Sequence, residues 1–578
     1  MHMTPTANAG LPQRRADFDS LADALDYAAQ GHTGLNFFNS RGQLTAALPY
    51  RDLRVRAQDL ARRLAGLGLP REARVVIVAE TDADFVAVFF ACQYAGLLPV
   101  PVALPVGLGG KDAYIGQLRR QIETSGASIA LGPASLAGFL TEAAAGLGLV
   151  LIGSAADVAA LPESQAPLRP LAAGERCYLQ YSSGSTRFPL GVDITQRALM
   201  ANMHGVVVDG LDVNEQDRAS SWLPLYHDMG LIGFVLAPVV SQRSCDLMPT
   251  REFARRPLQW LTLIGKHRAT LTYSPSFGFD LCARAAAKGS LEGLDLRFWR
   301  SAGIGGDMIQ PAILRRFAET FAPVGFDARA LFPSYGMAET CVALTMVKHG
   351  TGLTIDKISR KGLADGRAQP GAPGDDEREL ASCGPPMPGH QIEIRGEDGK
   401  KLADRQVGRI FAKGPSIMPG YFNAPEASAA VLVGGGWLDT GDLGYTIAGS
   451  VVVTGRAKDL IIVNGRNIWP QDLEWGIETI AGLRRGDAAA FSLDDETAHS
   501  TGAETVVVLV QCRLGEVAAR QALKRDVAAK VREIAAIDCQ VALIPPKGLP
   551  QTSSGKLSRA RAKTNYLAGQ YANADPIG

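Results

Sequence analysis

The sequence predicts an α/β protein: a large N-terminal domain of stacked, parallel-type sheets with helices, followed by a small β-barrel and a small α+β C-terminal domain. At 578 residues the chain is too long for a single core, so two or more domains are expected. Helical stretches alternate with short β-prone runs, which indicates parallel sheets covered by helices. An apolar content of 46% and a charged content of 20% are typical of a folded globular protein.

The first half of the chain carries the helix–strand alternation. Residues 1 to about 18 are polar, and we expect them to be frayed. After Leu21, helices are predicted at Tyr50–Leu67, Asp84–Ala95 and Gly116–Ser125. Strands are predicted at Arg74–Val78, Pro99–Val102, Ser128–Leu131, Leu149–Ile152, Trp222–Leu225, Ala269–Thr272 and Phe298–Ala302.

The second half of the chain differs from the first in amino-acid composition. Between Lys348 and Leu380 the chain is rich in Gly, Pro, Asp and Lys, which indicates a surface excursion. Short strands at Gln391–Arg395, Gly408–Lys413 and Ser450–Val453 then predict the small barrel or meander. From Arg456 onward, strands at Leu460–Val463, Thr505–Cys512 and Gln540–Ile544 and helices at Pro470–Thr479 and Leu514–Ile534 suffice for a separate domain. The predicted domains are therefore residues 1–455 and 456–578.

Several classes of protein are excluded by composition. Phe85–Gly110 has no formal charge and is long enough to span a membrane, but prolines break its second half, so it predicts a buried helix and a buried strand rather than a membrane segment. The balance of 59 basic against 58 acidic residues gives no indication of a nucleic-acid partner. Eight single cysteines without a C-x-x-C pair, and no apparent signal peptide, favour a cytoplasmic location.

A hydroxyl- and glycine-rich loop joins two β-prone runs between Tyr181 and Val192. Such a loop can hold a phosphate chain, because glycine allows close backbone approach while hydroxyl and N–H groups donate to the anion. The Walker spacing is absent. The loop residues in question are Ser182, Ser183, Gly184, Ser185, Thr186 and Arg187.

Five further motifs follow in order. They are Pro224–Gly230 with His227; Ser301–Asp307 with Gly303; Ser334–Thr340 with Tyr335, Gly336, Met337 and Glu339; Trp437–Asp442; and Leu549–Lys556. Each alone could be a core histidine, a tight turn or a solvated lysine. Glu339 offers an oxygen ligand to Mg²⁺, and Asp442 could accept both hydroxyls of a ribose. Together and in this order, the motifs are hard to explain as separate structural features.

With Gly455-Arg456-Ala457-Lys458-Asp459 between the last two, the six motifs resemble the adenylate-forming enzymes: acyl-CoA synthetases, luciferases and peptide-synthetase adenylation domains. The resemblance covers about Leu21 to Asn565. It implies a mobile C-terminal domain hinged near Lys458, with ATP and Mg²⁺ bound between the domains.

The roles that this resemblance implies are as follows. The loop from Ser182 to Arg187 holds the β- and γ-phosphates, Tyr335 stacks on adenine, Asp442 and Arg456 bind ribose, Glu339 binds Mg²⁺, and Lys556 reaches the α-phosphate and the attacking carboxylate. Gly303, Ser334, Gly336, Met337 and Lys458 complete the predicted nucleotide site, and His227 joins Lys556 and Glu339 as a predicted catalytic residue. A carboxylate that attacks phosphorus builds up negative charge in the transition state, so catalysis is expected to depend on the positioning of the reactants and on nearby cations.

Several features resemble the fatty acyl-AMP ligase branch: the phosphate loop, the motifs at 226–230, 333–339 and 464–472, and an extra segment before Ser382. In the phosphate loop, Arg187 and Leu190 stand where the wider family has glycine and lysine, and the pattern S-T-R-x-P-x-G resembles that branch. An extra segment at about Gly352 to Glu379 resembles the insertion that in this branch is thought to hinder the coenzyme A state. The resemblance thus implies a medium- or long-chain fatty acid substrate and an acyl carrier protein as acceptor; a tolerated surface loop is the alternative.

An apolar slot for the fatty acid is expected near these motifs. The candidates are Trp222, Met229, Gly230, Leu231, Ile232, Phe234, Phe277 and Phe279. Ordinary core residues would give the same pattern. Three other functions stay open: an acyl-CoA synthetase, a catalytically inactive sensor and, less favoured because His227 replaces an amine-binding acid, an amino-acid adenylation domain.

Overall fold

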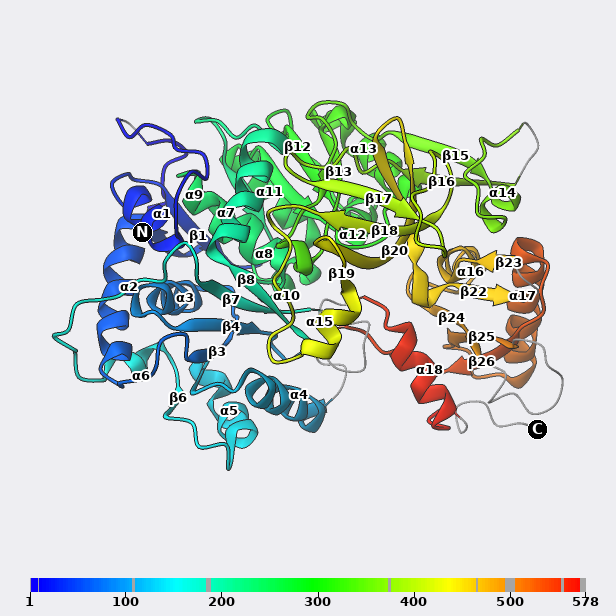
Figure 1. Ribbon diagram of the computed structural model, residues 1–578. Coiled ribbons are helices and arrows are strands. Elements are labelled where there is room, and N and C mark those ends of the chain that lie inside the picture. The colour runs from blue at the N-terminus through cyan, green and yellow to red at the C-terminus, as the bar shows by residue number, and fades with distance from the viewer. Residues whose placement is uncertain are drawn as a thin grey trace.

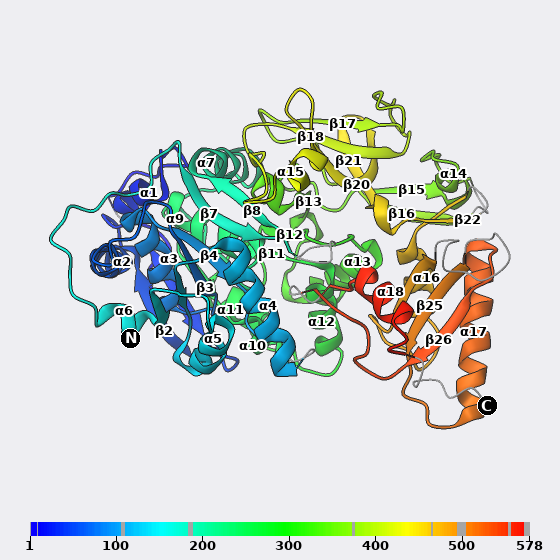
Figure 2. The ribbon, with the colours of Figure 1, turned by 60° about the horizontal axis from the view of Figure 1, so that its bottom comes forward.

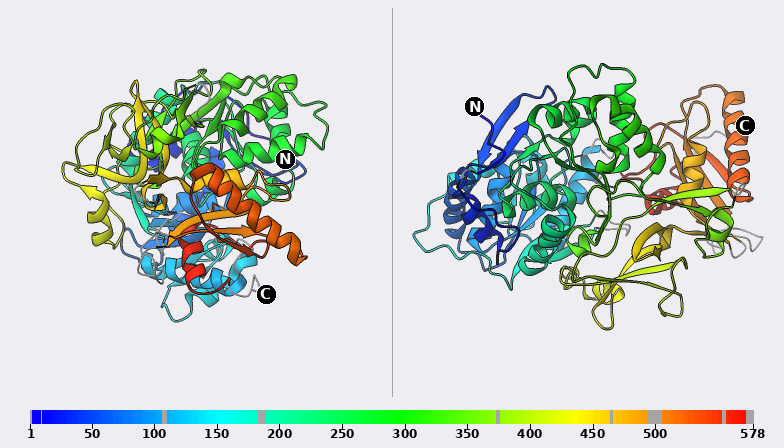
Figure 3. Two further views of the ribbon diagram at one scale, coloured as in Figure 1. Left: turned by 90° about the vertical axis from the view of Figure 1, so that its right-hand side faces the viewer. Right: turned by 90° about the horizontal axis from the view of Figure 1, so that it is seen from above.

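A computed structural model describes residues 2–8, 10–105, 110–182, 189–372, 376–463, 466–493, 505–552 and 556–571 (Figure 1). It confirms the predicted fold class. Two large sheets with helices form the N-terminal domain, a small barrel follows, and a compact α+β unit lies at the opposite end of the molecule from the N-terminus (Figures 1 and 3).

The larger sheet has the order β14-β13-β12-β11-β9-β10-β1-β2, and all strands between β13 and β1 pair in parallel. Its strands are β1 (Gly34–Phe38), β2 (Leu44–Pro49), β9 (Ala219–Ser221), β10 (Cys245–Leu247), β11 (Leu271–Ser274), β12 (Ser301–Ile304), β13 (Leu331–Tyr335) and β14 (Thr345–Met346). The antiparallel edge strands β2 and β14 close the two ends. Parallel strands bring their carboxyl ends to one edge of the sheet, where ligands bind in such folds.

The smaller sheet is fully parallel, in the order β4-β3-β5-β6, and the hairpin of β7 and β8 packs against β4. These strands are β3 (Arg74–Val78), β4 (Leu98–Val102), β5 (Ile129–Leu131), β6 (Leu151–Gly153), β7 (Arg176–Tyr181) and β8 (Gly191–Thr195). Helix α3 (Ala83–Ala95) is buried from Phe85 to Tyr94 and leads into the fully buried β4. The predicted buried helix and strand are thus confirmed (Figure 2).

The remaining N-terminal helices cover the sheets. They are α1 (Leu21–Ala28), α2 (Tyr50–Ala65), α4 (Gly110–Ser125), α5 (Ala137–Ala144), α6 (Ala155–Ala159), α7 (Gln196–His204), α8 (Asp228–Leu231), α9 (Ala237–Val240), α10 (Thr250–Arg255), α11 (Pro257–His267), α12 (Ser276–Ala286) and α13 (Pro311–Phe321). Two π-helical segments, η2 (Gly205–Gly210) and η3 (Ile232–Leu236), continue α7 and α8. Such segments often mark functional sites.

The barrel subdomain and the C-terminal unit follow in sequence. The barrel strands are β17 (Gln391–Arg395), β18 (Gly408–Lys413), β19 (Leu432–Val433), β20 (Trp437–Ile447) and β21 (Ser450–Arg456), with α15 (Pro425–Val431) between β18 and β19. The C-terminal elements are β22 (Ile461–Val463), β23 (Arg466–Ile468), α16 (Pro470–Ile477), β24 (Ala488–Leu493), β25 (Thr505–Gln511), α17 (Val517–Ala535), β26 (Gln540–Ile544) and α18 (Arg559–Leu567). A separate hydrophobic cluster, with members from Ile461 to Leu543, forms the core of the C-terminal unit. We call these C-terminal elements the C-terminal domain.

The predicted surface excursion is an ordered hairpin. Strands β15 (Ile355–Ser359) and β16 (Glu377–Ala381) pair antiparallel, with α14 (Arg360–Ala364) after β15. Its apolar residues pack with Tyr445 and Val452 of the barrel and with Trp469 of the C-terminal domain. In Figures 1 and 2 the hairpin lies beside β22 and β23, at the junction of the two domains.

Two predictions of local structure were wrong. The N-terminal segment is held rather than frayed: Thr4 is buried, and its N–H donates to Asn36 Oδ1 at 2.9 Å. The strand predicted at Trp222–Leu225 ends before Trp222, because β9 spans Ala219–Ser221 and the apolar run that follows is an irregular core segment. No helix in the described ranges has the length and hydropathy needed to cross a membrane.

Candidate active site

A cavity of about 310 Å³ lies at the carboxyl-end edge of β12 and β13. The two strands end at Ile304 and Tyr335, and the turns after them, with Gly306 and Gly336, line the cavity. Lys556 of the C-terminal domain lines it from the other side. We call this space the inner cavity.

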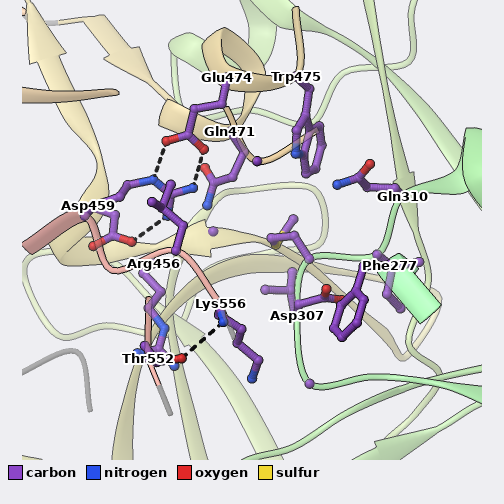
Figure 4. A pocket seen from close by; sticks show the side chains of 18 of the residues that line it. Phe277, Asp307, Gln310, Arg456, Asp459, Gln471, Glu474, Trp475, Thr552 and Lys556 are labelled. Carbon is purple, nitrogen blue, oxygen red and sulfur yellow. Dashed lines mark hydrogen bonds and ion pairs between the residues drawn. The ribbon is translucent and has the colours of Figure 1, made fainter. Parts of the chain in front are cut away.

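A second cavity of about 550 Å³, the interdomain cavity, lies between the N-terminal and C-terminal domains (Figure 4). Phe277, Asp307 and Gln310 face it from the N-terminal domain, and Gln471 and Trp475 from the C-terminal domain. Both cavities share Gly306, Ser334, Gly336, Arg456 and Lys556 as lining residues. The side chain of Lys556 therefore lies where the two cavities meet.

Steric crowding explains why two of the predicted site positions are occupied by glycine. A Cβ atom at Gly336 would lie 2.0 Å from the carbonyl oxygen of Val342. At Gly303 it would lie 2.4 Å from the ring of Tyr273. Any side chain at either position would displace the wall of the inner cavity.

Tyr335, Asp442 and Arg456 form one hydrogen-bonded group. The hydroxyl of Tyr335 donates to Asp442 Oδ2 at 2.8 Å, and Arg456 Nε lies 3.4 Å from Asp442 Oδ1. Asp442 and Arg456 are cross-strand partners in β20 and β21, so strand register sets the pair. Burial raises the pKa of Asp442, and the charge of Arg456 and the Tyr335 hydrogen bond partly offset this rise. The predicted adenine and ribose residues are thus brought together at the interdomain cavity.

Glu339 presents a buried carboxylate to the inner cavity from a short 3₁₀ turn (Ala338–Thr340). It is 8% exposed, and Tyr421 donates its hydroxyl to Oε1 at 2.8 Å. Burial raises the pKa of Glu339, while the Tyr421 hydrogen bond and the charge of Arg456 work against this rise.

Glu339 fits a magnesium ion that is carried by a nucleotide. Among the described residues, no group of three or more His, Cys, Asp or Glu side chains could hold a metal ion alone. Mg²⁺ in nucleotide sites takes one or two carboxylates, with phosphates and water completing the shell. One buried carboxylate facing a phosphate-sized space matches that donor set.

His227 and Asp228 lie side by side at the start of α8, with Nδ1 of His227 2.5 Å from Oδ1 of Asp228, and the N–H of Met229 donates to both atoms. Burial opposes ionisation of Asp228, but His227, the N–H of Met229 and Lys556 outweigh it, so the pKa of Asp228 is lowered. Both residues line the inner cavity. The sequence analysis selected His227 but missed Asp228, the adjacent residue.

Lys556 enters from a turn of the C-terminal domain. The turn is closed by Thr552, whose N–H donates to the Lys556 carbonyl at 2.7 Å and whose Oγ1 accepts from the Lys556 N–H at 3.2 Å. Burial lowers the pKa of the Lys556 ammonium, and the charges of Asp307 and Asp228 oppose this shift. No described residue lies within hydrogen-bond or ion-pair distance of that ammonium.

Lys458 and Asp307 also face the interdomain cavity. Lys458 lies on the 3₁₀ turn Ala457–Asp459 between the barrel and the C-terminal domain, and burial lowers its pKa to about 8. Burial raises the pKa of Asp307 to about 6, although the charges of Lys556 and Arg485 counteract it. Asp307 and Arg485 were not selected from the sequence, since single charged residues near a glycine turn give no distinct signal.

The predicted phosphate loop is only partly described. Ser182 lines the inner cavity, whereas Ser183, Gly184, Ser185, Thr186 and Arg187 lie outside the described residues. Their phosphate contacts, including the replacement of the missing lysine by Arg187, stay predictions. Ser334 and Met337 both line the inner cavity.

The predicted acyl residues fall into three groups. Met229 and Phe234 line the inner cavity, and Phe277 lines the interdomain cavity. The other five line neither cavity: Trp222, Gly230, Leu231, Ile232 and Phe279. Trp222 stacks on Phe253 at 4.0 Å between ring centroids, and a Cβ at Gly230 would lie 2.1 Å from the carbonyl oxygen of Pro224. These five residues are packed in the core, so the structure assigns them to packing rather than to the cavity wall.

The apolar end of the inner cavity is lined by residues that the sequence analysis missed. They are Val206, Tyr273, Val342, Ala343 and Met346, which lie beside the predicted acyl residue Phe234. Val206 and Phe234 come from the two π-helical segments, whose wider turns shift the phase of the helical pattern. Val342 and Ala343 directly follow the Glu339 motif, and that proximity is the one sequence signal that could have found them.

Comparisons with known proteins agree with this geometry. Residues 26–422 match the family described as AMP-binding enzyme. "Putative acyl-CoA synthetase" of Caulobacter vibrioides is 51% identical over 98% of this chain and 99% of that protein. Long-chain-fatty-acid–AMP ligase FadD26 of Mycobacterium tuberculosis is 31% identical over the whole of both chains. A solved structure from work on fatty acyl-adenylate ligases of E. coli and L. pneumophila superposes with a TM-score of 0.92 at 42% identity, covering 97% of this chain and 100% of that one.

The fold and the site thus define an acid-activating ligase of the adenylate-forming class. The chain belongs to the AMP-binding enzyme family and, within it, to the fatty acyl-AMP ligase branch.

Proposed function

We propose that this protein joins a medium- or long-chain fatty acid to the AMP portion of ATP and releases pyrophosphate. It then passes the acyl group to the phosphopantetheine thiol of an acyl carrier protein and releases AMP. One observation carries the proposal: Lys556, Glu339 and an apolar slot lined by Val206, Phe234 and Met346 all face the same cavity. The apolar slot can bind the fatty acid chain, while the cation and the metal-binding carboxylate can bind the phosphates of the nucleotide with which it reacts.

In the first step, a carboxylate oxygen of the fatty acid forms a bond to the α-phosphorus of ATP, and the bond from that phosphorus to the pyrophosphate oxygen breaks. Negative charge gathers on the α-phosphate oxygens and on the leaving group. Fixed positive charge in a dry site stabilises such a transition state strongly. Lys556 supplies one positive charge, and its lowered pKa reflects the dry surroundings.

The other residues of the site position the reactants. Tyr335 and Asp442 hold the adenosine at the interdomain cavity, while the apolar end of the inner cavity holds the acyl chain. Mg²⁺, bound by Glu339 and the nucleotide, would neutralise phosphate charge. His227 and Asp228 lie on the wall of the inner cavity, which Lys556 also lines, and we expect them to orient the attacking carboxylate.

The contacts of the β15–β16 hairpin favour a carrier protein as acceptor. Asp472 of the C-terminal domain pairs with Arg360 and with Arg378, both at 3.0 Å, and the Arg378 guanidinium lies 5.4 Å from the ring centroid of Trp469. Arg378 is 2% exposed. Because these buried contacts must break for the C-terminal domain to rotate, they hold it in the arrangement with Lys556 in the site.

The names of two relatives agree with the two possible acceptors. Medium-chain-fatty-acid–[acyl-carrier-protein] ligase JamA of Moorena producens is 28% identical over 96% of both chains. The Caulobacter relative, by contrast, is named an acyl-CoA synthetase. The alternative function is therefore transfer to coenzyme A after the same first step.

Mass spectrometry of the products separates the two. The purified protein is incubated with ATP, Mg²⁺ and dodecanoic acid, alone, with coenzyme A, and with a phosphopantetheinylated carrier protein. We expect acyl-AMP that coenzyme A does not consume and that the carrier protein converts to a thioester. Acyl-CoA in the second reaction would make the alternative correct, and no acyl-AMP in any reaction would contradict the proposed first step.

A further inference from the structure

The loop after Glu339 contains a strained turn. Cys341 has φ 67° and ψ −70°, and the N–H of Val342 donates to the carbonyl of Thr340 at 3.0 Å, which makes a γ-turn. γ-turns with positive φ are rare, and a residue with a Cβ persists in one only where its surroundings hold it there. Something adjacent must therefore stabilise residues 339–343.

Asn202 of helix α7 supplies that stabilisation. Its Nδ2 donates to the carbonyls of Thr340 at 3.0 Å and Ala343 at 2.7 Å, and its Oδ1 accepts from the Ala343 N–H at 3.3 Å. These bonds hold the backbone on both sides of Cys341. Asn202 is fully buried and lines neither cavity.

A hydrogen-bonded chain agrees with the orientation of the Asn202 amide that its bonds to Thr340 and Ala343 already set. Nδ1 of His390 lies 3.1 Å from the carbonyl of Pro388, so it carries the proton, and Nε2 then accepts from the hydroxyl of Ser416 at 2.7 Å. The hydroxyl oxygen of Ser416 is left to accept from Asn202 Nδ2 at 3.1 Å. Burial lowers the pKa of His390, which keeps this ring neutral. The chain thus requires Nδ2, not Oδ1, on the side of Ser416 and Thr340.

The loop 339–343, which Asn202 stabilises, contributes both to the metal side of the site and to the apolar slot. Glu339 begins it on the metal side, while Val342 and Ala343 end it on the wall of the apolar slot. We propose that Asn202 is a positioning residue that sets the Glu339 carboxylate and the acyl wall together through the strained turn at Cys341. The assignment of Glu339 to the metal and of Val342 and Ala343 to the acyl chain rests on the proposed function. The hydrogen bonds of Asn202 to the loop do not depend on it.

The test is the isosteric variant Asn202→Asp, which keeps the shape of the side chain but loses both donors. Hydrogen exchange of the full-length protein, without nucleotide or metal, is followed by mass spectrometry on peptides covering residues 338–346. We expect the amides of this loop to exchange about tenfold faster or more, because local opening becomes easier. The dissociation constant for dodecanoic acid, measured on the same metal-free protein, should rise about threefold to tenfold as the wall loosens.

Ser416→Ala is the matched control. It breaks the chain to His390 but leaves the bonds of Asn202 to Thr340 and Ala343, so loop exchange and fatty acid affinity should stay within about twofold of wild type. Equal changes in Ser416→Ala and Asn202→Asp would show general loosening of the core and would overturn the proposal. Unchanged loop exchange in Asn202→Asp would overturn it as well.

A second substitution tests the role of strain. Glycine adopts positive φ without cost from a Cβ, so Cys341→Gly should restore slow loop exchange and fatty acid affinity in the Asn202→Asp background. No restoration would contradict the strained-turn argument. Should Asn202→Asp not fold, Asn202→Ser replaces it, because one hydroxyl donor remains and intermediate exchange is then expected. If the protein formed no acyl-AMP at all, these measurements on the metal-free protein would still decide the role of Asn202.

Discussion

The N-terminal domain and the C-terminal domain face the same reaction space, but they hold their charged groups differently. Asp442 has Tyr335 and Arg456 as partners, and Glu339 has Tyr421. The ammonium of Lys556 has no hydrogen-bond or ion-pair partner among the described residues, although its pKa is lowered by burial.

The presence or absence of a partner determines how each buried charge affects the stability of the protein. Burying a charge is costly unless it is paired, so a partnered group contributes to one stable arrangement and an unpartnered one does not. The N-terminal carboxylates named above are thus held in one arrangement, whereas the C-terminal domain brings in a cation that has no partner among the described residues and that the substrate can pair with. A charge that is satisfied only by the reacting groups stabilises the transition state rather than the empty enzyme.

The largest effect is expected for Lys556→Ala. Acyl-AMP formation should fall about a thousandfold, because a cation in a dry site stabilises phosphoryl charge by several kcal/mol. The melting temperature should stay within about 2 °C of wild type, since the ammonium has no partner to lose. Pyrophosphate release and thermal melting measure the two quantities.

Arg561→Ala is the control for that variant. Arg561 is exposed on α18, five positions after Lys556, so its loss should leave the rate unchanged. A Lys556→Ala variant that lost stability but kept its rate would reverse the contrast drawn between the domains.

Glu339→Gln tests the preorganised side. We expect acyl-AMP formation to fall about a hundredfold and the Mg²⁺ concentration for half-maximal rate to rise, because a neutral amide is a poor ligand for a hard cation. Tyr421→Phe is matched to it, since it removes the hydrogen bond to Glu339 and keeps the carboxylate; a loss of less than about tenfold is expected there. If both variants had the same Mg²⁺ dependence, Glu339 would not be the metal ligand.

Much of the fold could be predicted from the sequence because local pattern and burial agree. The strand Arg74–Val78 is found with the predicted bounds, and the uncharged run around Phe85 is the buried helix and strand that its prolines indicate. Prediction failed where tertiary contacts decide. Thr4 is polar but is held by Asn36 from a distant strand, and the apolar run at Trp222 packs in the core without joining a sheet.

The candidate site divides in the same way. Motifs such as Tyr335–Glu339 could be found because their residue types have few other uses in that order, and the structure brings them to one edge of the sheet. Among the slot residues, Phe234 could be selected because it closely follows the His227 motif. Val206 could not, since it is an ordinary apolar residue placed by a π-helical turn far from any motif. The role of Asn202 depends on Thr340 and Ala343, more than a hundred positions away.

Asp472→Asn sharpens the comparison at the domain junction. The variant leaves Arg378 buried beside a neutral side chain, and losing one partner of a buried pair costs about 3 kcal/mol. We expect lower thermal stability and, because the C-terminal domain is released, detectable acyl-CoA when coenzyme A is supplied. Asp376→Asn is the matched control: it also pairs with Arg360, but Asp376 is 66% exposed, so a loss under about 0.5 kcal/mol is expected. Stability loss without any acyl-CoA would mean that these contacts do not govern the acceptor.

The smallest effect concerns Glu478, on the C-terminal side of the interdomain cavity. Burial raises its pKa to about 7, against an ordinary value of 4.5, although the N–H of Gly486 donates to Oε1 at 2.6 Å. The carboxyl is neutral in both folded and unfolded protein below pH 4.5, so its unfavourable contribution grows as the pH rises from there to about 7 and stays constant above. Glu478→Gln keeps an acceptor for Gly486 and removes the charge.

We therefore expect Glu478→Gln to raise the free energy of unfolding by about 1–2 kcal/mol at pH 8, after allowing for partial exposure, and by much less at pH 5. Urea unfolding of both proteins at the two pH values measures this. Asp442→Asn makes the comparison with the N-terminal side: burial raises the pKa of Asp442 as well, but the substitution takes the carboxylate partner from Arg456 and weakens the acceptor of Tyr335, so it should destabilise the protein at pH 8. Opposite signs for the two substitutions would confirm that Asp442 is a partnered charge and Glu478 an unsatisfied one; equal signs would contradict it.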